Sequence, residues 1–215
     1  MTKTAIVLGA TGLVGSALVE QLVLNDAYEK VVLFLRRYSG RHNEKLVEHI
    51  IDFDDPDSWK HLVKGDVLFS AFGTTIKKAG SQQNQFRIDY TYQYQMAEIA
   101  KNNGVTTCVL VSSAGADAKS KIFYSRMKGQ LDDAIKALGF ENLILLKPSV
   151  LVGQRNETRF GETVGIVVGR WLTRMPGLKK YKPIEAVTVA KAMINGAAGM
   201  GKQTFELNEL FDLAQ

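Results

Sequence analysis

Short, continuous apolar runs alternate along the chain with longer segments in which apolar residues recur every three or four positions. Runs such as Ala5–Leu8, Val31–Leu35 and Val109–Val111 are typical of strands that are covered on both faces. On this pattern we predict strands at Thr4–Leu8, Lys30–Leu35, Leu46–Asp52, Val67–Phe72, Val105–Ser112 and Asn142–Lys147.

The segments between these runs have the spacing of amphipathic helices. We predict helices at Gly12–Leu24, Asp57–Val63, Gln82–Asn103, Tyr124–Leu138 and Ile184–Ala198. Alternating strands and helices predict an α/β fold: a doubly wound parallel sheet with helices on both faces, in three layers, joined by right-handed crossovers. A chain of 215 residues is long enough for one such domain.

Turn-forming residues support several of these boundaries. Asp55–Asp57 supplies a capping carboxylate and a proline at the first helical position. Gly104 and Gly139 follow two helices where a left-handed residue is expected. The segment at about 153–183 is irregular and rich in glycine, so we expect a loop there that covers the substrate side of the single domain.

A glycine-rich turn joins the first strand to the first helix. Gly9 permits a tight turn, Gly12 lets the backbone approach a pyrophosphate, and Gly15 lets the helix pack against the strand. The helix N-terminus offers unpaired amides and its positive dipole end to phosphates. The spacing is GxxGxxG rather than GxGxxG, and an ordinary glycine turn is the alternative. We predict a cofactor site at Gly9, Ala10, Thr11, Gly12, Leu13, Val14 and Gly15.

The end of the second strand indicates which nicotinamide cofactor is bound. An acidic residue there would bind the ribose 2′-hydroxyl of NAD, whereas arginine pairs with the 2′-phosphate of NADP. This strand ends in Leu35, Arg36 and Arg37 without an acid. The pattern therefore favours NADP(H), with two solvated surface arginines as the alternative.

Further cofactor contacts are expected where later strands end, because ligands bind at the carboxyl ends of the strands in such sheets. Asp52 closes the third strand and could accept from the adenine amino group; a helix-capping or solvated role is the alternative. Gly73 would let the chain pass beside the cofactor after the fourth strand. The predicted contacts in these two places are Asp52, Phe53, Phe72, Gly73 and Thr74.

The region after the fifth strand holds candidate catalytic residues. Tyr124 and Lys128 are four residues apart on one helical face, and an ammonium group beside a phenol favours the phenolate. Such a tyrosine can give a proton to a carbonyl oxygen, and a serine hydroxyl can orient that oxygen. Of Ser112 and Ser113, we choose Ser113, which is farther beyond the strand. An amphipathic helix with a half-buried tyrosine and a solvated lysine is the alternative.

These motifs together resemble those of an atypical short-chain dehydrogenase/reductase: the glycine turn, Ser112–Ser113, Tyr124 with Lys128, and Lys147–Ser149. Further stretches resemble the Tat-interacting protein branch of oxidoreductase-like proteins, over nearly the whole chain. These stretches are Phe72–Thr75, Lys78–Gly80, Arg87–Tyr90, Ser113–Asp117 and Arg155–Glu162.

The resemblance implies a Rossmann fold, NADPH binding and a catalytic set of Ser113, Tyr124 and Lys128. It also implies that the segment after the sixth strand runs beside the nicotinamide, which adds Pro148, Ser149 and Val150 to the expected cofactor contacts. The remaining expected contacts are Ser112, Tyr124 and Lys128. The chain lacks the long C-terminal substrate domain of extended family members, so a sugar-nucleotide substrate is not implied.

Composition narrows the remaining classes of function. The net charge of +5 comes from scattered basic residues without interleaved aromatics, so we expect no nucleic-acid partner. Cys108 lies in an apolar run and fits a core residue, and the three histidines are not spaced for a shared metal. No apolar stretch is long enough to span a bilayer, and the N-terminus does not resemble a secretory signal. We therefore expect no metal, no membrane partner and a cytoplasmic location.

Two functional hypotheses follow. The first is an NADP(H)-dependent oxidoreductase that transfers hydride to or from a small carbonyl or alcohol, with Arg155 and Arg159 binding an anionic substrate or lying on the surface. The second is a non-enzymatic NADP(H) sensor or scaffold that binds a protein partner. Intact Tyr124 and Lys128 favour the enzyme, because a sensor needs no proton donor. The sequence leaves the substrate and any homo-oligomer undetermined.

Overall fold

The predicted parallel sheet is the centre of the fold. The computed structural model describes residues 2–153, 182–199 and 201–215. Within these residues a seven-stranded sheet has the order β3-β2-β1-β4-β5-β6-β9, with every neighbouring pair parallel. A short parallel pair joins β7 to β8. The strands are β1 (Lys3–Leu8), β2 (Tyr28–Leu35), β3 (Leu46–Ile50), β4 (Val67–Ser70), β5 (Thr107–Val111), β6 (Asn142–Lys147), β7 (Leu151–Val152), β8 (Ile184–Glu185) and β9 (Lys202–Glu206).

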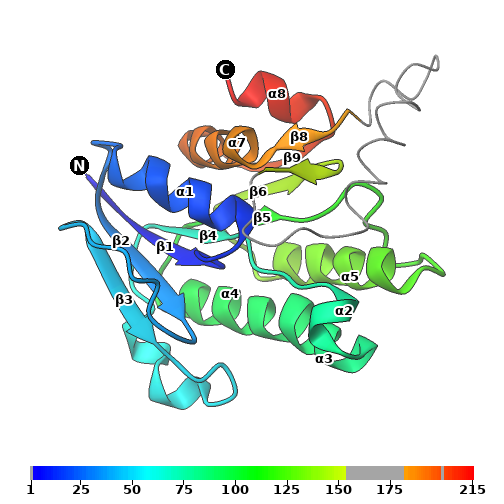
Figure 1. The fold of residues 1–215 in the computed structure, drawn as a ribbon, viewed down its shortest axis with the longest axis horizontal. Helices are drawn as coiled ribbons and strands as arrows, with labels where there is room; N and C mark the ends of the chain where they lie inside the picture. Colours follow the sequence, from blue (N-terminus) through cyan, green and yellow to red (C-terminus); the bar gives the residue numbers. More distant parts are fainter. Residues whose placement is uncertain (1, 154–181, 200) are drawn as a thin grey trace.

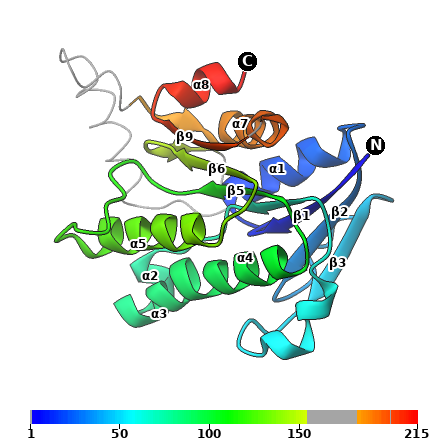
Figure 2. The same ribbon diagram turned by 180° about the vertical axis from the view of Figure 1, so that it is seen from behind.

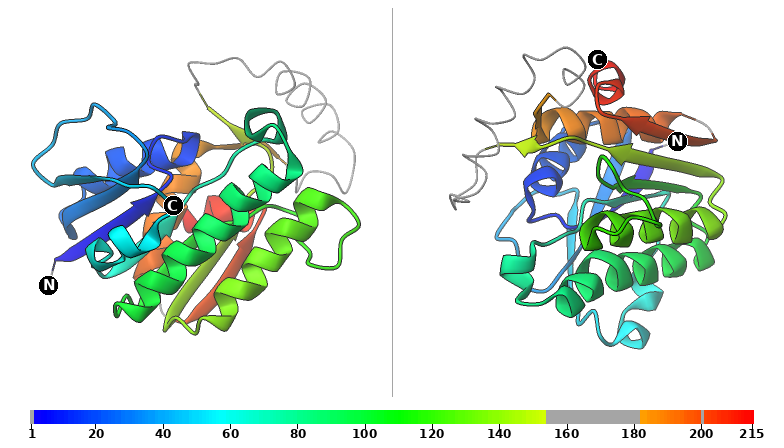
Figure 3. Two further views of the ribbon diagram at one scale, coloured as in Figure 1. Left: turned by 90° about the horizontal axis from the view of Figure 1, so that it is seen from below. Right: turned by 90° about the vertical axis from the view of Figure 1, so that its right-hand side faces the viewer.

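Helices cover both faces of this sheet and complete three layers. Figure 1 shows α1, α7 and α8 on one face and α4 and α5 on the other, and Figure 2 shows the same layers from behind. In Figure 3, α4 and α5 run side by side along their face. The fold is therefore a single Rossmann-type domain, as predicted. The helices are α1 (Leu13–Val23), α2 (Ile76–Ala79), α3 (Gln82–Phe86), α4 (Tyr92–Asn102), α5 (Phe123–Ala137), α7 (Ala186–Ala198) and α8 (Glu209–Leu213).

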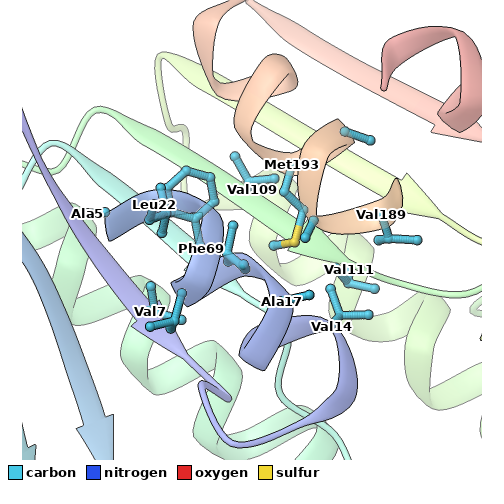
Figure 4. Close-up of a cluster of buried hydrophobic side chains, with 14 of the residues drawn as sticks. Ala5, Val7, Val14, Ala17, Leu22, Phe69, Val109, Val111, Val189 and Met193 are labelled. Atoms are coloured by element: carbon cyan, nitrogen blue, oxygen red, sulfur yellow. The ribbon is translucent and has the colours of Figure 1, made fainter. Parts of the chain in front are cut away.

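Successive residues of β1 contribute to two separate cores. Ala5 and Val7 pack in the core beneath α1 and α7, which Figure 4 shows, whereas Ile6 and Leu8 pack in the core beneath α4 and α5. Side chains alternate between the two faces of a strand, and here both faces are covered. This arrangement explains why the central strands are continuous apolar runs in the sequence.

Two C-terminal elements do not follow the pattern that predicted the others. The strand β9 pairs with β6 at the edge of the sheet, and α8 follows it. An edge strand has one neighbour and needs no continuous apolar run, so the polar stretch Lys202–Glu206 gave no signal. The predicted helix at Ile184–Ala198 begins at Ala186, because the two residues before it pair with β7.

The predicted helix at Asp57–Val63 is wrong. The segment forms two short 3-10 turns, η1 (Pro56–Ser58) and η2 (Lys60–Leu62). Trp59 lies between them, is buried, and donates its indole N–H to the carbonyl of Asp52 at 2.6 Å. Asp55 occupies the capping position, but its side chain makes no capping hydrogen bond. The burial of one large side chain therefore decides this local conformation.

The predicted helix at Gln82–Asn103 is interrupted. Between α3 and α4 the backbone forms a π-helical turn, η3 (Arg87–Thr91). The predicted left-handed residues after two helices are confirmed, since φ is +90° at Gly104 and +72° at Gly139. Turns of the π type occur often at functional sites, and this one carries a buried carboxylate, Asp89.

The predicted irregular segment at about 153–183 lies almost wholly outside the residues that the structure describes, as do Arg155 and Arg159. Over the described ranges, none of the helices is long and apolar enough to cross a membrane. In the same part of the chain, no three acidic, histidine or cysteine side chains gather in a way that could hold a metal ion.

Candidate functional site

The glycine turn after β1 is too crowded for side chains at two of its positions. Gly9 has φ +90°, and a Cβ there would lie 2.6 Å from the carbonyl oxygen of Ala71. A Cβ on Gly15 would lie 2.1 Å from the carbonyl oxygen of Gly9. The geometry thus requires glycine for the tight turn and for the close approach of α1, the two roles expected from the sequence.

The start of α1 offers backbone groups to a ligand. Gly12 is the N-cap residue, it has no side chain to cap the helix, and the first turn contains no acid. The amides at a helix N-terminus have no intrahelical partner, and they favour anions. Thr11, Gly12, Leu13 and Val14 all line one large cleft.

This cleft lies at the carboxyl ends of β1, β4 and β5 and has a volume of about 1760 Å³. Besides the start of α1, residues that were predicted to bind the cofactor or to take part in catalysis line this cleft. The predicted site residues brought together here are Thr11, Gly12, Leu13, Val14, Arg37, Phe72, Gly73, Thr74, Ser112, Tyr124 and Lys128. The structure therefore joins the glycine turn and the candidate catalytic helix in one site.

A second cavity of about 360 Å³ lies where β2 and β3 end. Arg36, Asp52 and Phe53 line it, so the two adjacent arginines face different cavities, Arg36 the smaller and Arg37 the larger. Lys78 of α2 lines both cavities. A dinucleotide is long enough to need two such adjoining spaces, one for each nucleotide half.

Aromatic side chains pack together beside the smaller cavity. The ring of Phe53 is buried, stacks on Phe72 with centroids 5.4 Å apart and contacts Tyr92 at 5.2 Å. Tyr92 donates its hydroxyl to Asp54 at 2.6 Å, and Arg87 pairs with the same carboxylate. The Tyr92 hydrogen bond is the main reason why the pKa of Asp54 is lowered. Because the Phe53 ring is enclosed, this residue would meet a ligand chiefly through its backbone.

Tyr124 and Lys128 stand in contrasting environments on one face of α5. Tyr124 is 41% exposed at the mouth of the cleft, whereas Lys128 is 3% exposed. The Lys128 Nζ donates to the carbonyl of Val111 at 3.2 Å. Burial lowers the pKa of Lys128, and the carboxylates of Asp89 and Asp132 oppose this effect. The alternative interpretation of a solvated lysine is therefore wrong.

The two serines after β5 differ in how their hydroxyls are placed. Ser112 lines the cleft, but its Oγ is buried and has no hydrogen-bond partner among the described residues. Ser113 is half-buried, lies outside the cleft lining, and its Oγ donates to the carbonyl of Ala114 at 3.3 Å. Neither hydroxyl therefore points freely into the cleft, and the choice of Ser113 for contact with a substrate oxygen stays a prediction.

The segment after β6 runs next to the serine pair. The carbonyl of Pro148 accepts from the amide of Ala114 at 3.0 Å, and the Ser149 hydroxyl donates to the carbonyl of Lys182 at 2.5 Å. Val150 is exposed. These three residues do not line the cleft in the described part of the chain, so their contact with a nicotinamide stays a prediction.

Asp89 is a site residue that the sequence analysis did not select. It lies in η3, is buried, lines the cleft and accepts from the amide of Thr74 at 2.6 Å. Burial raises its pKa to about 6, against the opposing effect of the Lys128 charge. The sequence signals were an acid on the apolar face of the predicted helix and its place in the family-like stretch Arg87–Tyr90.

The fold is that of a nucleotide-binding domain of the Rossmann type. Residues 9–161 match a family described as NAD(P)H-binding, and the chain belongs to this family.

Proteins of similar sequence carry the name FMP52. The chain is 39% identical over 199 residues to "Protein FMP52, mitochondrial" of Candida albicans, covering 89% of this chain and 86% of that protein. It is 34% identical over 205 residues to the protein of the same name from Emericella nidulans, covering 91% and 87%.

Solved structures with a similar fold include several epimerases. The UDP-glucose 4-epimerase of Thermotoga maritima has a TM-score of 0.70 at 18% identity, covering 98% of this chain and 81% of that one. The ADP-L-glycero-D-manno-heptose-6-epimerase of Helicobacter pylori has a TM-score of 0.72 at 17% identity, covering 96% and 76%. At such low identity, the likeness supports the Rossmann-type fold alone.

Two sequence-based expectations change in the light of these relatives. The predicted cytoplasmic location is wrong, because several relatives are named mitochondrial. That prediction rested on the lack of a secretory signal, and the chemistry of the fold does not report a compartment. The relatives are named FMP52 rather than Tat-interacting protein, so the broader NAD(P)H-binding family is what the comparison supports.

Proposed function

We propose that the protein is an NADP(H)-dependent oxidoreductase of the atypical short-chain dehydrogenase/reductase type, acting on a small carbonyl or alcohol. One observation carries the proposal: the start of α1 and the pair Tyr124 and Lys128 line the same cleft. A phosphate-binding helix N-terminus and a proton donor beside a buried cation are the two parts that hydride transfer to a carbonyl requires.

The residues around the cleft fit a bound dinucleotide. The amides of Thr11, Leu13 and Val14 would hold the pyrophosphate, because the Gly12 amide donates to the carbonyl of Gly9 at 2.9 Å. Asp52 and the Phe53 backbone would border the adenine in the smaller cavity. Lys128 would hold the nicotinamide ribose. When bound, the cofactor supplies or accepts the hydride, and the protein provides binding, orientation and the proton.

The arginine pair supports NADP(H) rather than NAD. Arg36 and Arg37 follow β2 directly, line the two adjoining cavities, and no acid takes the place that would bind a free ribose hydroxyl. Guanidinium groups pair with a phosphate through charge-assisted hydrogen bonds. Lys78, which lines both cavities, adds positive charge to the same region.

Proton transfer is assigned to Tyr124. Its phenol is exposed at the cleft and would give a proton to the substrate oxygen as hydride reaches the carbon, and take it back in the reverse direction. The Lys128 ammonium favours the phenolate form, and Ser113 would orient the substrate oxygen by a hydrogen bond. Arg155 and Arg159 stay predictions for an anionic substrate group.

The proposal is tested by offering the protein NADPH with a panel of small aldehydes and ketones and following the loss of NADPH absorbance. We expect NADPH oxidation with at least one carbonyl compound, and nucleotide binding by fluorescence titration. Tight NADPH binding without turnover of any compound would point instead to a sensor, and no binding at millimolar nucleotide would exclude both functions.

A further inference from the structure

A second buried carboxylate lies one helical turn beyond Lys128. Asp132 of α5 is 2% exposed, and its carboxylate oxygens make no hydrogen bond of ordinary geometry among the described residues, although the nearby Ser112 hydroxyl lowers the pKa of this carboxyl. Its neighbour Asp133 is exposed and pairs with Lys136 at 3.6 Å, as a surface carboxylate usually does. A buried carboxylate without well-formed hydrogen bonds is costly, so its retention calls for a physical reason.

The groups that face Asp132 come from three elements. Lys128 and Lys136 lie on the same helix, Ser112 follows β5 and Lys147 ends β6, and all four lower the pKa of Asp132 against the larger effect of burial, which raises it. The Lys147 Nζ is 3.7 Å from Asp132 Oδ2, beyond an ordinary hydrogen bond.

Lys147 is held more closely by another acid. Its Nζ is 3.2 Å from the carboxylate of Glu206, the residue opposite it in the β6–β9 register. Lys147 is thus shared between Glu206 and Asp132. The charge of the other buried cation, Lys128, lowers the pKa of Asp132 more than the charge of Lys147 does.

Lys128 in turn is flanked by acids from two elements. Asp89 approaches from η3 and Asp132 from its own helix, and both favour the ammonium form that burial opposes. Residues four apart lie on one helical face, so Tyr124, Lys128 and Asp132 form a line from the mouth of the cleft into the protein. The phenol is at the exposed end and the carboxylate is at the enclosed end.

We propose that Asp132 is a positioning residue that holds the Lys128 ammonium charged and in place behind Tyr124. The proposal rests on the proposed function, because it acts only through Tyr124 and Lys128. The buried Ser112 hydroxyl belongs to the same arrangement, since it lowers the pKa of the Asp132 carboxyl.

The test is a spectrophotometric titration of the Tyr124 phenol, which needs neither substrate nor cofactor. The tyrosinate absorbance of each protein is followed from neutral to alkaline pH, and the curve of the matching Tyr124→Phe protein is subtracted. Removing a cation beside a phenol disfavours the phenolate, so Lys128→Met should raise the Tyr124 midpoint by about 1 pH unit or more. Asp132→Asn should raise it in the same direction.

Matched variants separate charge from packing. Asp133→Asn removes the neighbouring exposed charge and should leave the midpoint unchanged. Asp132→Glu keeps the carboxylate and should stay close to the parent protein. In the Lys128→Met background, Asp132→Asn should cause no further rise, because the group through which it acts is gone.

The outcomes distinguish the two proposals. If Lys128→Met raises the midpoint but Asp132→Asn leaves it unchanged or lowers it, the role of Asp132 is refuted while the proposed function stands. An equal rise of the Tyr124 midpoint in Asp132→Glu and Asp132→Asn would show a packing effect and would also refute the role of Asp132. If Lys128→Met itself has no effect, the tyrosine–lysine chemistry of the proposed function fails.

Discussion

Gly15 lies so close to Gly9 that a Cβ atom on Gly15 would be 2.1 Å from the carbonyl oxygen of Gly9. The obstacle is backbone, which cannot turn aside as a flexible side chain can. The close approach fixes the start of α1 against the turn that precedes it. The amides at the start of the helix, which are assigned to the pyrophosphate, are therefore held in place by two glycines that no ligand needs to touch.

Gly15→Ala should consequently destabilise the fold and weaken nucleotide binding together. We expect a loss of about 2–3 kcal/mol of unfolding free energy, the upper part of the range for overpacking, measured by urea denaturation. The comparison is Gly40→Ala, at a residue with φ +74° and no atom within 4 Å of a new Cβ, which should keep NADPH affinity. Equal effects of both variants on NADPH affinity would refute the special role of the turn.

Arg36→Ala combined with Arg37→Ala should reduce affinity for NADPH far more than for NADH. A charge-assisted hydrogen bond contributes about 1.5–3 kcal/mol, so we expect a loss on the order of 10- to 100-fold for NADPH. Fluorescence titration with each nucleotide measures it. Lys77→Ala is the control, since it removes a basic residue of α2 that lines neither cavity. Equal losses for NADPH and NADH would contradict the 2′-phosphate assignment.

Tyr124→Phe should abolish turnover while leaving NADPH affinity within a few fold. General acid catalysis contributes about 10²- to 10⁴-fold, and removal of one hydroxyl at the exposed end of the cleft leaves the phosphate contacts intact. The measurement is kcat with the carbonyl compound that the panel identifies, beside a nucleotide titration. Tyr38→Phe, at a residue that is 77% exposed, should behave like the parent protein. Turnover unchanged in Tyr124→Phe would remove this residue from the mechanism.

Asp89 makes the stability of the protein depend on pH. Burial raises its pKa from 3.8 to about 6, so the folded state holds this proton more tightly than the unfolded chain does. The tighter binding of this proton stabilises the folded state fully below the pKa that Asp89 has in the unfolded chain. This stabilisation is lost as pH rises through about 6. At neutral pH the buried charge should cost up to about 3 kcal/mol, from the free energy equivalent of the pKa difference.

Asp89→Asn removes this cost and can still accept from the Thr74 amide. We therefore expect the unfolding free energy of Asp89→Asn, relative to that of the parent protein, to increase as pH rises from acid to neutral. Urea denaturation at a series of pH values tests this, with Asp133→Asn as the exposed comparison. A difference that does not vary with pH would show that Asp89 titrates in the folded protein as it does in the unfolded chain.

The central strands and the glycine turn could be predicted because each depends on a local requirement. Asn142–Lys147 is predicted and observed with the same bounds, since a strand covered on both faces must be apolar at successive positions. Gly9 and Gly15 belong to a turn whose tightness excludes side chains, and this restriction is visible as spacing in the sequence. The edge strand β9 and the 3-10 turns around Trp59 escaped prediction because neither imposes such a pattern.

The sequence by itself therefore determined the order of the central strands and their helices, the glycine turn and the placing of Tyr124 and Lys128 on one helix. Only the tertiary structure decided that Lys128 is buried between Asp89 and Asp132, that Ser112 is turned inward, and that the two arginines face different cavities. Burial and charge environment depend on which elements pack together. The spacing of residues along the chain does not indicate this packing when the elements are distant in sequence.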